Sequence, residues 1–140
     1  MSTYNRVYGY GTSSMKNIKT TTKEVQDLCL RAMEIAGKRK LYCPDFGISE
    51  GKRTTARQRY LFKEGASKCD GIINRSKHQD GLAIDYFAYH LGKADYDPGR
   101  LALIFTCFQE AALDMGIQIK WGGNFNSIAD APHIELVTSI

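Results

Sequence analysis

Residues 76–89 read Ser76-Lys77-His78-Gln79-Asp80-Gly81-Leu82-Ala83-Ile84-Asp85-Tyr86-Phe87-Ala88-Tyr89. From Leu82 onward the stretch is apolar, β-branched and aromatic, which predicts a buried strand over residues 82–89. Alternation along this strand puts Asp85 on one face and Ile84 and Tyr86 on the other. A carboxylate on so apolar a strand has to be paired, hydrogen-bonded or bound to a metal ion.

One histidine precedes this strand, and a second lies near the C-terminus. His78 falls in the loop before residue 82, and His133 falls in Asp130-Ala131-Pro132-His133-Ile134-Glu135-Leu136. Two imidazoles and a carboxylate suffice for a catalytic zinc ion that keeps a fourth position open for water. A further carboxylate nearby can then take the proton of that water. Spacing alone leaves a metal site and a structural role for these histidines equally open.

The composition is that of a soluble globular protein. The chain has 140 residues, 43% hydrophobic and 24% charged, and we expect a single domain over residues 1–140. No apolar run approaches the roughly 18 residues of a transmembrane helix. Residues 1–12 lack the apolar core of a signal peptide. We therefore expect a protein that is made in the cytoplasm and does not insert stably into a membrane.

The charge and the cysteines exclude several classes of protein. A net charge of +4 suits an anionic partner such as a cell-wall polymer or nucleic acid, although plain solubility is the simpler explanation. No block of like charges resembles a nucleic-acid-binding arm, so we expect no nucleic-acid partner. The four cysteines form no CxxC pair, which argues against a zinc ribbon and a disulfide framework. Cys29 and Cys107 fall on apolar faces of predicted helices and should be buried free thiols.

Apolar spacing and capping signals predict three helices. They span about residues 21–37, 55–65 and 97–116. The first two begin with the spacing of a capping box, at Thr21 and at Thr55. The third begins at Asp97, an N-cap candidate followed by proline, and carries the longest apolar stripe of the chain.

The remaining segments are predicted to be strands and loops. Strands are expected over about residues 42–49, 82–89, 117–121 and 134–137, and a loop over 66–77. Residues 1–20 show no strong periodicity and should form an extended or looped arm. Helices separate most of the strands, but a loop joins the last two, so the prediction is an α+β fold with a small antiparallel or mixed sheet.

Three motifs in the chain resemble those of a known family. Residues 76–85 resemble the S-x-H-x-x-G-x-A-x-D motif of the D-Ala-D-Ala metallopeptidases, the VanX/VanY-type family. Residues 130–136, preceded by Trp121-Gly122-Gly123, resemble the W-G-G…D-x-P-H-x-E ending of its phage-endolysin branch. Gly51-Lys52-Arg53-Thr54, followed by Gln58, resembles its G-x-R-[ST]…Q segment. The similarity covers about residues 46–137 and is closest to the L-alanyl-D-glutamate peptidases that bacteriophages use as endolysins.

The resemblance implies a zinc site and its fold. It implies a single domain with a Hedgehog/DD-peptidase-like fold in which His78, Asp85 and His133 bind Zn²⁺. It also implies that Asp130 is the general base. Glu135 is either a partner of His133 or part of an ion pair elsewhere on the sheet, and the sequence favours neither.

The resemblance also implies the groups that meet the substrate. Arg53 would hold the substrate or the developing oxyanion, and Gln58 would contact the substrate. Ser76 would either contact the substrate or orient His78. Two positions depart from relatives: the turn at residues 122–125 reads Gly-Gly-Asn-Phe where relatives often carry Gly-Gly-Asp-Trp, and VanX-like members use a glutamate where Asp130 stands. The aspartate favours the endolysin branch.

The implied function is that of a zinc-dependent endopeptidase that hydrolyses the L-Ala-D-Glu bond of the peptidoglycan stem peptide. The enzyme would act as a monomer without a separate wall-binding domain. It would stay in the host cytoplasm until it is released to the wall in the periplasm. Two alternatives remain: a D-Ala-D-Ala carboxypeptidase or dipeptidase with the same site, and a non-catalytic zinc-stabilised virion or binding protein. The second would not need Asp130.

Overall fold

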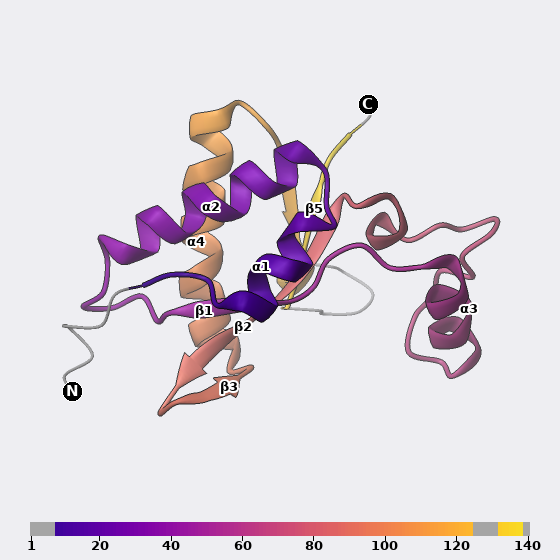
Figure 1. Ribbon diagram of the computed structural model, residues 1–140, viewed down its shortest axis with the longest axis horizontal. Helices are drawn as coiled ribbons and strands as arrows, with labels where there is room; N and C mark the ends of the chain where they lie inside the picture. The colour runs from indigo at the N-terminus through magenta and orange to yellow at the C-terminus, as the bar shows by residue number, and fades with distance from the viewer. Residues whose placement is uncertain (1–7, 125–131, 139–140) are drawn as a thin grey trace.

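The computed structural model describes residues 8–124 and 132–138 (Figure 1). Its helices (α), 3₁₀ turns (η) and strands (β) are, in chain order, α1 (Thr12–Lys19), α2 (Lys23–Gly37), β1 (Phe46–Glu50), α3 (Thr55–Lys63), η2 (Lys77–Asp80), β2 (Ala83–His90), β3 (Lys93–Asp95), α4 (Pro98–Met115), β4 (Ile119–Trp121), η3 (Gly122–Asn124) and β5 (His133–Leu136). None of the described helices is both long and apolar enough to span a membrane.

The strands form a single sheet with the order β1-β2-β5-β4, and β3 pairs with β2. All described strand pairs are antiparallel, so the predicted α+β fold is confirmed with the antiparallel form of its sheet. The short strand β3 was not predicted, because three exposed or half-buried residues carry no apolar pattern. It forms a hairpin with the end of β2.

One face of the sheet packs on a layer of helices. Figure 1 shows α1, α2 and α4 gathered on this side, and all three contribute to one continuous core. Ile84 and Tyr86 of β2 are completely buried there, and the Tyr86 hydroxyl donates a hydrogen bond to the Leu101 carbonyl of α4 at 2.7 Å. Cys29 and Cys107 are buried free thiols in this core, as predicted. Because Ile84 and Tyr86 face the helices, Asp85 faces the opposite side of the sheet.

Helix α3 stands apart from this layer, at the right of Figure 1. Gln58 is its only buried residue. The predicted helices at residues 55–65 and 21–37 are present as α3 and α2, but each begins one residue away from the expected cap. Thr22 and Thr54 are the N-caps, with side chains that accept hydrogen bonds from Val25 and Arg57. Each helix start has adjacent threonines, and all of them have the same preference for the N-cap position, so residue type alone does not show which of them is the cap.

Residues 12–19 form helix α1, although an extended or looped arm was expected over residues 1–20. The prediction was wrong for Thr12–Lys19, because only Met15 and Ile18 are apolar in this segment and two residues set no periodicity. Tertiary contacts hold the helix instead. Ser14 Oγ accepts a hydrogen bond from the Ile48 amide at 3.0 Å, and Asn17 Nδ2 donates one to the Ile48 carbonyl at 2.7 Å. These side chains of α1 thus satisfy backbone groups of β1.

Candidate metal centre

The site lies on the face of the sheet that is turned away from the helices. Asp85 of β2 and His133 of β5 stand opposite each other in the strand register. On β5, Ile134 and Leu136 enter the core, so His133 and Glu135 share the other face. The strand alternation that buries the core therefore places an aspartate, a histidine and a glutamate together on the opposite side.

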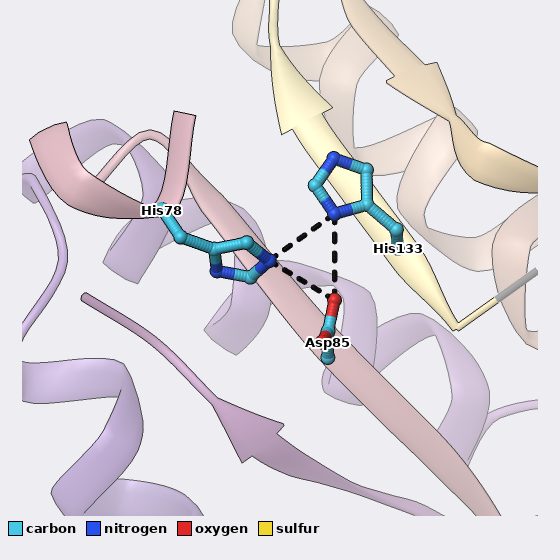
Figure 2. A group of neighbouring side chains, drawn as sticks. All are labelled: His78, Asp85 and His133. Atoms are coloured by element: carbon cyan, nitrogen blue, oxygen red, sulfur yellow. Dashed lines mark hydrogen bonds and ion pairs between the residues drawn. The ribbon is translucent and has the colours of Figure 1, made fainter. Parts of the chain in front are cut away.

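Three side chains converge at this point (Figure 2). His78 Nε2 lies 3.1 Å from Asp85 Oδ1 and 3.2 Å from His133 Nδ1. His133 Nδ1 lies 3.4 Å from the same Asp85 oxygen, which closes the triangle. Among the described residues this is the group of histidine, cysteine and acidic side chains with the spacing to hold a metal ion. The structure thus brings together the three residues that the resemblance implies as ligands.

Each imidazole is held by its outer nitrogen. His78 Nδ1 lies 2.9 Å from the Gly51 carbonyl oxygen, and His133 Nε2 lies 2.9 Å from Glu135 Oε1. Both partners accept hydrogen bonds, so these two ring nitrogens carry the protons. The other two ring nitrogens, His78 Nε2 and His133 Nδ1, point at the centre of the triangle. Glu135 pairs with His133, which resolves the two alternatives that the sequence left open for this carboxylate.

The charges in the triangle stabilise one another. Burial would lower the pKa of His133, but hydrogen bonds to Asp85 and Glu135 outweigh burial and raise this pKa to about 9. Burial would likewise raise the pKa of each carboxyl, but hydrogen bonds from the histidines hold the pKa of Asp85 and of Glu135 below the usual value. Without a metal ion, a proton on His133 Nδ1 can therefore occupy the position between the three ligand atoms.

The short turn η2 positions His78. Ser76 is its N-cap: the hydroxyl accepts a hydrogen bond from the His78 amide at 3.2 Å, and the Gln79 side chain accepts one from the Ser76 amide at 2.9 Å. Gly81 ends the turn in the left-handed conformation, with a φ of 70°. Ser76 is thus placed to orient the backbone of His78, one of its two expected roles, and it also lines the cavity of the site.

Helix α1 supports the other side of His78 through Gly51. A Cβ atom at Gly51 would lie 2.2 Å from the Asn17 carbonyl oxygen and 2.4 Å from Thr20 Oγ1, so only glycine allows this approach. The Thr20 hydroxyl also accepts a hydrogen bond from the Lys52 amide at 2.8 Å. The N-terminal segment therefore fixes the carbonyl group that holds the His78 ring.

Arg53 is anchored before any substrate binds. Its guanidinium pairs with Glu50 and donates a hydrogen bond to Gln58 Oε1 at 2.6 Å. Its amide donates to the His78 carbonyl at 2.8 Å, which ties the arginine to η2. Gln58 is completely buried and does not line the cavity, so the structure places it behind Arg53 and not at the substrate contact expected for it. Its amide group donates to Ser67 and to the Cys69 carbonyl.

The three candidate ligand residues open onto a cavity of about 640 Å³. Arg53 and Ser76 line it as expected, and so do four charged residues that the sequence analysis did not assign to the site: Glu50, Arg57, Arg75 and Lys77. Glu50 reaches this face because a β-bulge shifts the register of β1 between Ile48 and Glu50. No pattern in the sequence predicted this bulge. The predicted base, Asp130, lies outside the described residues.

Comparison with known proteins agrees with this geometry. A family model described as phage L-alanyl-D-glutamate peptidase matches residues 6–137. The chain belongs to this family. The L-alanyl-D-glutamate peptidase of Escherichia phage T5 is 30% identical over 124 residues, which cover 88% of this chain and 85% of that relative. The phage L-alanyl-D-glutamate peptidase family therefore accounts for almost the whole chain, including the N-terminal helix that the motifs did not reach.

Two solved structures share the fold of this member of the phage L-alanyl-D-glutamate peptidase family. The Serratia marcescens L-Ala D-Glu endopeptidase ChiX superposes with a TM-score of 0.81 at 26% identity, covering 97% of this chain and 96% of ChiX. The vancomycin-resistance D,D-pentapeptidase VanY, solved in complex with Zn(II), superposes with a TM-score of 0.55 at 13% identity. It covers 79% of this chain and 71% of VanY, and it shows the shared fold alone.

Proposed function

We propose that the protein is a zinc-dependent peptidoglycan endopeptidase that hydrolyses the L-Ala-D-Glu bond of the stem peptide. The observation that carries this proposal is the triangle of His78, Asp85 and His133, which opens onto a cavity beside the anchored guanidinium of Arg53. Membership of the phage L-alanyl-D-glutamate peptidase family supports the choice of bond.

The donor set fits zinc. Zinc bonds to histidine nitrogen and carboxylate oxygen are about 2.0–2.2 Å long, so two ligand atoms of a tetrahedral site lie about 3.3–3.6 Å apart. The three atoms here are 3.1, 3.2 and 3.4 Å apart, close to this spacing. Both imidazoles are anchored by their outer nitrogens, so that His78 Nε2 and His133 Nδ1 face the centre. Three protein ligands beside a cavity are typical of catalytic zinc, whereas structural sites close all four positions.

Each residue of the site has a defined part in the proposed hydrolysis. A bound zinc ion would supply Lewis acidity toward the scissile carbonyl and the attacking water. Arg53, held by Glu50 and Gln58, offers a fixed positive charge to the oxygen that becomes negative, and loss of one such contact typically costs about 100- to 1000-fold in rate. Asp130 accepts the proton of the attacking water and passes it to the leaving amine. Gly51 and Glu135 keep the two imidazoles in place.

Product analysis tests the scissile bond. Purified Gram-negative peptidoglycan would be digested and the new N-terminal residues labelled and identified. We expect glutamate, no product after chelation, and recovery when zinc is restored. New alanine N-termini would instead assign a D-Ala-D-Ala peptidase, and binding to the wall without any product would assign a non-catalytic protein.

The proposal extends to the state and place of action of the enzyme. We infer a monomer that is held in the host cytoplasm and acts on the wall in the periplasm after a separate protein has permeabilised the membrane. Light scattering of the purified enzyme should give the mass of one chain, 15.7 kDa. Cells that express the enzyme alone should remain intact until their membrane is permeabilised from outside.

Glu135→Gln should weaken zinc binding by about 10- to 100-fold, the usual cost of losing a carboxylate that orients a metal-bound histidine. The amide keeps the size of the side chain but no longer draws the Nε2 proton of His133 with a full negative charge. Competition with a chromogenic chelator measures the affinity. Asp114→Asn, which neutralises an exposed carboxylate on α4, is the matched control and should bind zinc like the wild type. Equal affinity in both variants would contradict the role assigned to Glu135.

Zinc binding should release a proton and weaken as the pH falls. The pKa of His133 is about 9 without metal, so its imidazole is protonated at neutral pH and must lose the Nδ1 proton to become a ligand. Between pH 8 and pH 7 the apparent zinc affinity should fall about tenfold, because each zinc ion must displace one proton from His133 and the proton concentration rises tenfold. Calorimetry at pH 7 in buffers of different ionisation enthalpy should detect about one proton released per zinc bound. An affinity that stays constant over this range would show that His133 is neutral before the metal arrives.

A further inference from the structure

The positive charge of the protein is concentrated in one segment. Residues 52–77 hold eight of the 19 lysines and arginines but only two of the 15 acidic residues, a net charge of +6. The rest of the chain holds eleven cations and thirteen acids, a net charge of −2. This segment contains α3 and the connection that leads from it to η2.

Most cations of this segment have no acidic partner. Five cations on and around α3 form no ion pair with any carboxylate of the described residues: Lys52, Arg57, Arg59, Lys63 and Lys68. Unpaired lysines also occur elsewhere, as at Lys38 and Lys93, but the acids outside this segment outnumber the cations there. Unpaired charges of one sign on a common surface repel one another unless a ligand of opposite charge covers them.

Apolar side chains accompany these cations. Tyr60 is 53% exposed, Phe62 47%, Ile72 60% and Ile73 86%, all on α3 or in the connection that follows it. Arg59, Tyr60, Phe62 and Lys63 line an open groove of about 630 Å³ together with Ile72 and Asp70. The Asp70 carboxylate accepts hydrogen bonds from the backbone amides of residues 72–74, so its charge is already engaged. We call the surface formed by Arg57, Arg59 and Lys63 together with Tyr60, Phe62 and Ile72 the α3 face. Its combination of cations with exposed rings suits a ligand that is anionic and also offers apolar or sugar surfaces.

The α3 face is continuous with the catalytic cavity. Arg57 lines the cavity, and its guanidinium lies over the Tyr60 ring at 5.3 Å from the centroid, while Tyr60 lines the groove. Arg57 and Tyr60 thus join the two openings across the surface of α3. A polymer that places one peptide in the cavity can therefore extend over the α3 face without leaving the protein.

We propose that the α3 face binds the peptidoglycan polymer next to the peptide that is cut. This inference rests on the proposed function, since it assigns the same polymer to a second surface. Stem peptides carry free carboxylates, and successive peptides along a glycan strand repeat this negative charge. The cations of the α3 face match such a repeated charge, and its exposed rings offer apolar surface to the sugars between the peptides. The continuity with the cavity favours the polymer over an anionic lipid surface as the occupant.

The test compares a polymeric with a small substrate. Arg59→Gln/Lys63→Gln removes two charges of the groove, and neither residue lines the catalytic cavity. Lys38→Gln/Lys93→Gln is the matched control, because both lysines are exposed, unpaired among the described residues and distant from α3 in sequence. Initial rates would be measured on intact sacculi and on a soluble stem tetrapeptide that contains L-Ala-D-Glu. Sedimentation with vesicles of phosphatidylglycerol and phosphatidylethanolamine would measure lipid binding in parallel.

We expect Arg59→Gln/Lys63→Gln to raise KM on sacculi about tenfold at low ionic strength, as for two cations facing an anionic surface. Its kcat on sacculi and its rate on the tetrapeptide should stay at the wild-type level, and the control should be unchanged on both substrates. The difference should vanish near about 1 M salt, where the Debye length is about 3 Å.

Two results would overturn the inference. A wild-type KM on sacculi in Arg59→Gln/Lys63→Gln would show that the polymer does not use the α3 face. A wild-type KM combined with lost vesicle binding would assign the face to a lipid surface instead. Both results differ from the one expected if the proposed function is wrong, because the wild-type enzyme would then not cut the tetrapeptide.

Discussion

An Asp85→Asn variant should lose more than about 100-fold in zinc affinity, and its peptidase activity should fall with the metal content. Loss of a group that merely orients a ligand already costs about 10- to 100-fold, and Asp85 is the anionic ligand itself. Its Oδ1 lies 3.1 Å from His78 Nε2 and 3.4 Å from His133 Nδ1, so the neutral amide also removes the negative charge that both rings share. Metal analysis after gel filtration, together with the rate on the tetrapeptide, measures both effects.

A second aspartate on the same sheet provides the control for this variant. Asp95 of β3 pairs with Arg100 at the far end of β2, and Asp95→Asn should keep full zinc content and activity. Thermal unfolding with and without added zinc separates metal loss from misfolding. An Asp85→Asn protein that folds, holds one zinc ion and cuts the tetrapeptide at the wild-type rate would remove Asp85 from the ligand set.

The parts of the fold that the sequence predicted are those in which local pattern and tertiary packing agree. β2 and α4 carry long apolar patterns, and both are in the core as expected. α1 carries almost none, and its contacts are with the backbone of β1, distant in sequence. Periodicity reports apolar burial alone, so a short polar helix held by side-chain hydrogen bonds stays invisible to it.

In the candidate site, the motif residues were predicted from the sequence, whereas the groups that support them were not. His78, Asp85 and His133 belong to recognisable motifs, and their convergence follows from the pairing of β2 with β5. The groups that hold them were harder to find. Gly51 acts through its carbonyl group, which no residue type encodes, and Glu50 enters the site only through the bulge of β1. Such contacts depend on register and close backbone approach, which a linear pattern does not specify.

The order of charged residues along the sequence does not show which cations are available to a partner. Lys38-Arg39-Lys40 is the densest run of cations in the sequence. In the structure Arg39 pairs with Glu110 and Lys40 lies 5.7 Å from the centre of the Tyr8 ring, so part of that charge is already engaged. Arg57, Arg59 and Lys63 of α3 are not consecutive in the sequence, yet none of them forms an ion pair with another described residue. Which charges are available to a partner is thus a property of the folded surface.

An Asp130→Asn variant should keep its zinc ion and lose hydrolysis by about 100- to 10,000-fold, the usual contribution of a general base. The amide has almost the size of the carboxylate but does not accept a proton from the attacking water. The assignment comes from the position of Asp130, three residues before His133 in the motif. Zinc content and kcat on the tetrapeptide would be measured on the same preparation, so that metal loss and loss of the base are distinguished.

The carboxylates already in the cavity support this role for Asp130. The described residues that line the cavity include three acids, Glu50, Asp85 and Glu135. Glu50 is paired with Arg53, and the pKa of Asp85 and of Glu135 is held below its usual value by hydrogen bonds from the histidines. A carboxylate that is committed in this way is a poor proton acceptor. Wild-type hydrolysis by Asp130→Asn would contradict the assignment. Glu50→Gln would then be the next variant to measure, because Glu50 lines the cavity and is not one of the three proposed metal ligands.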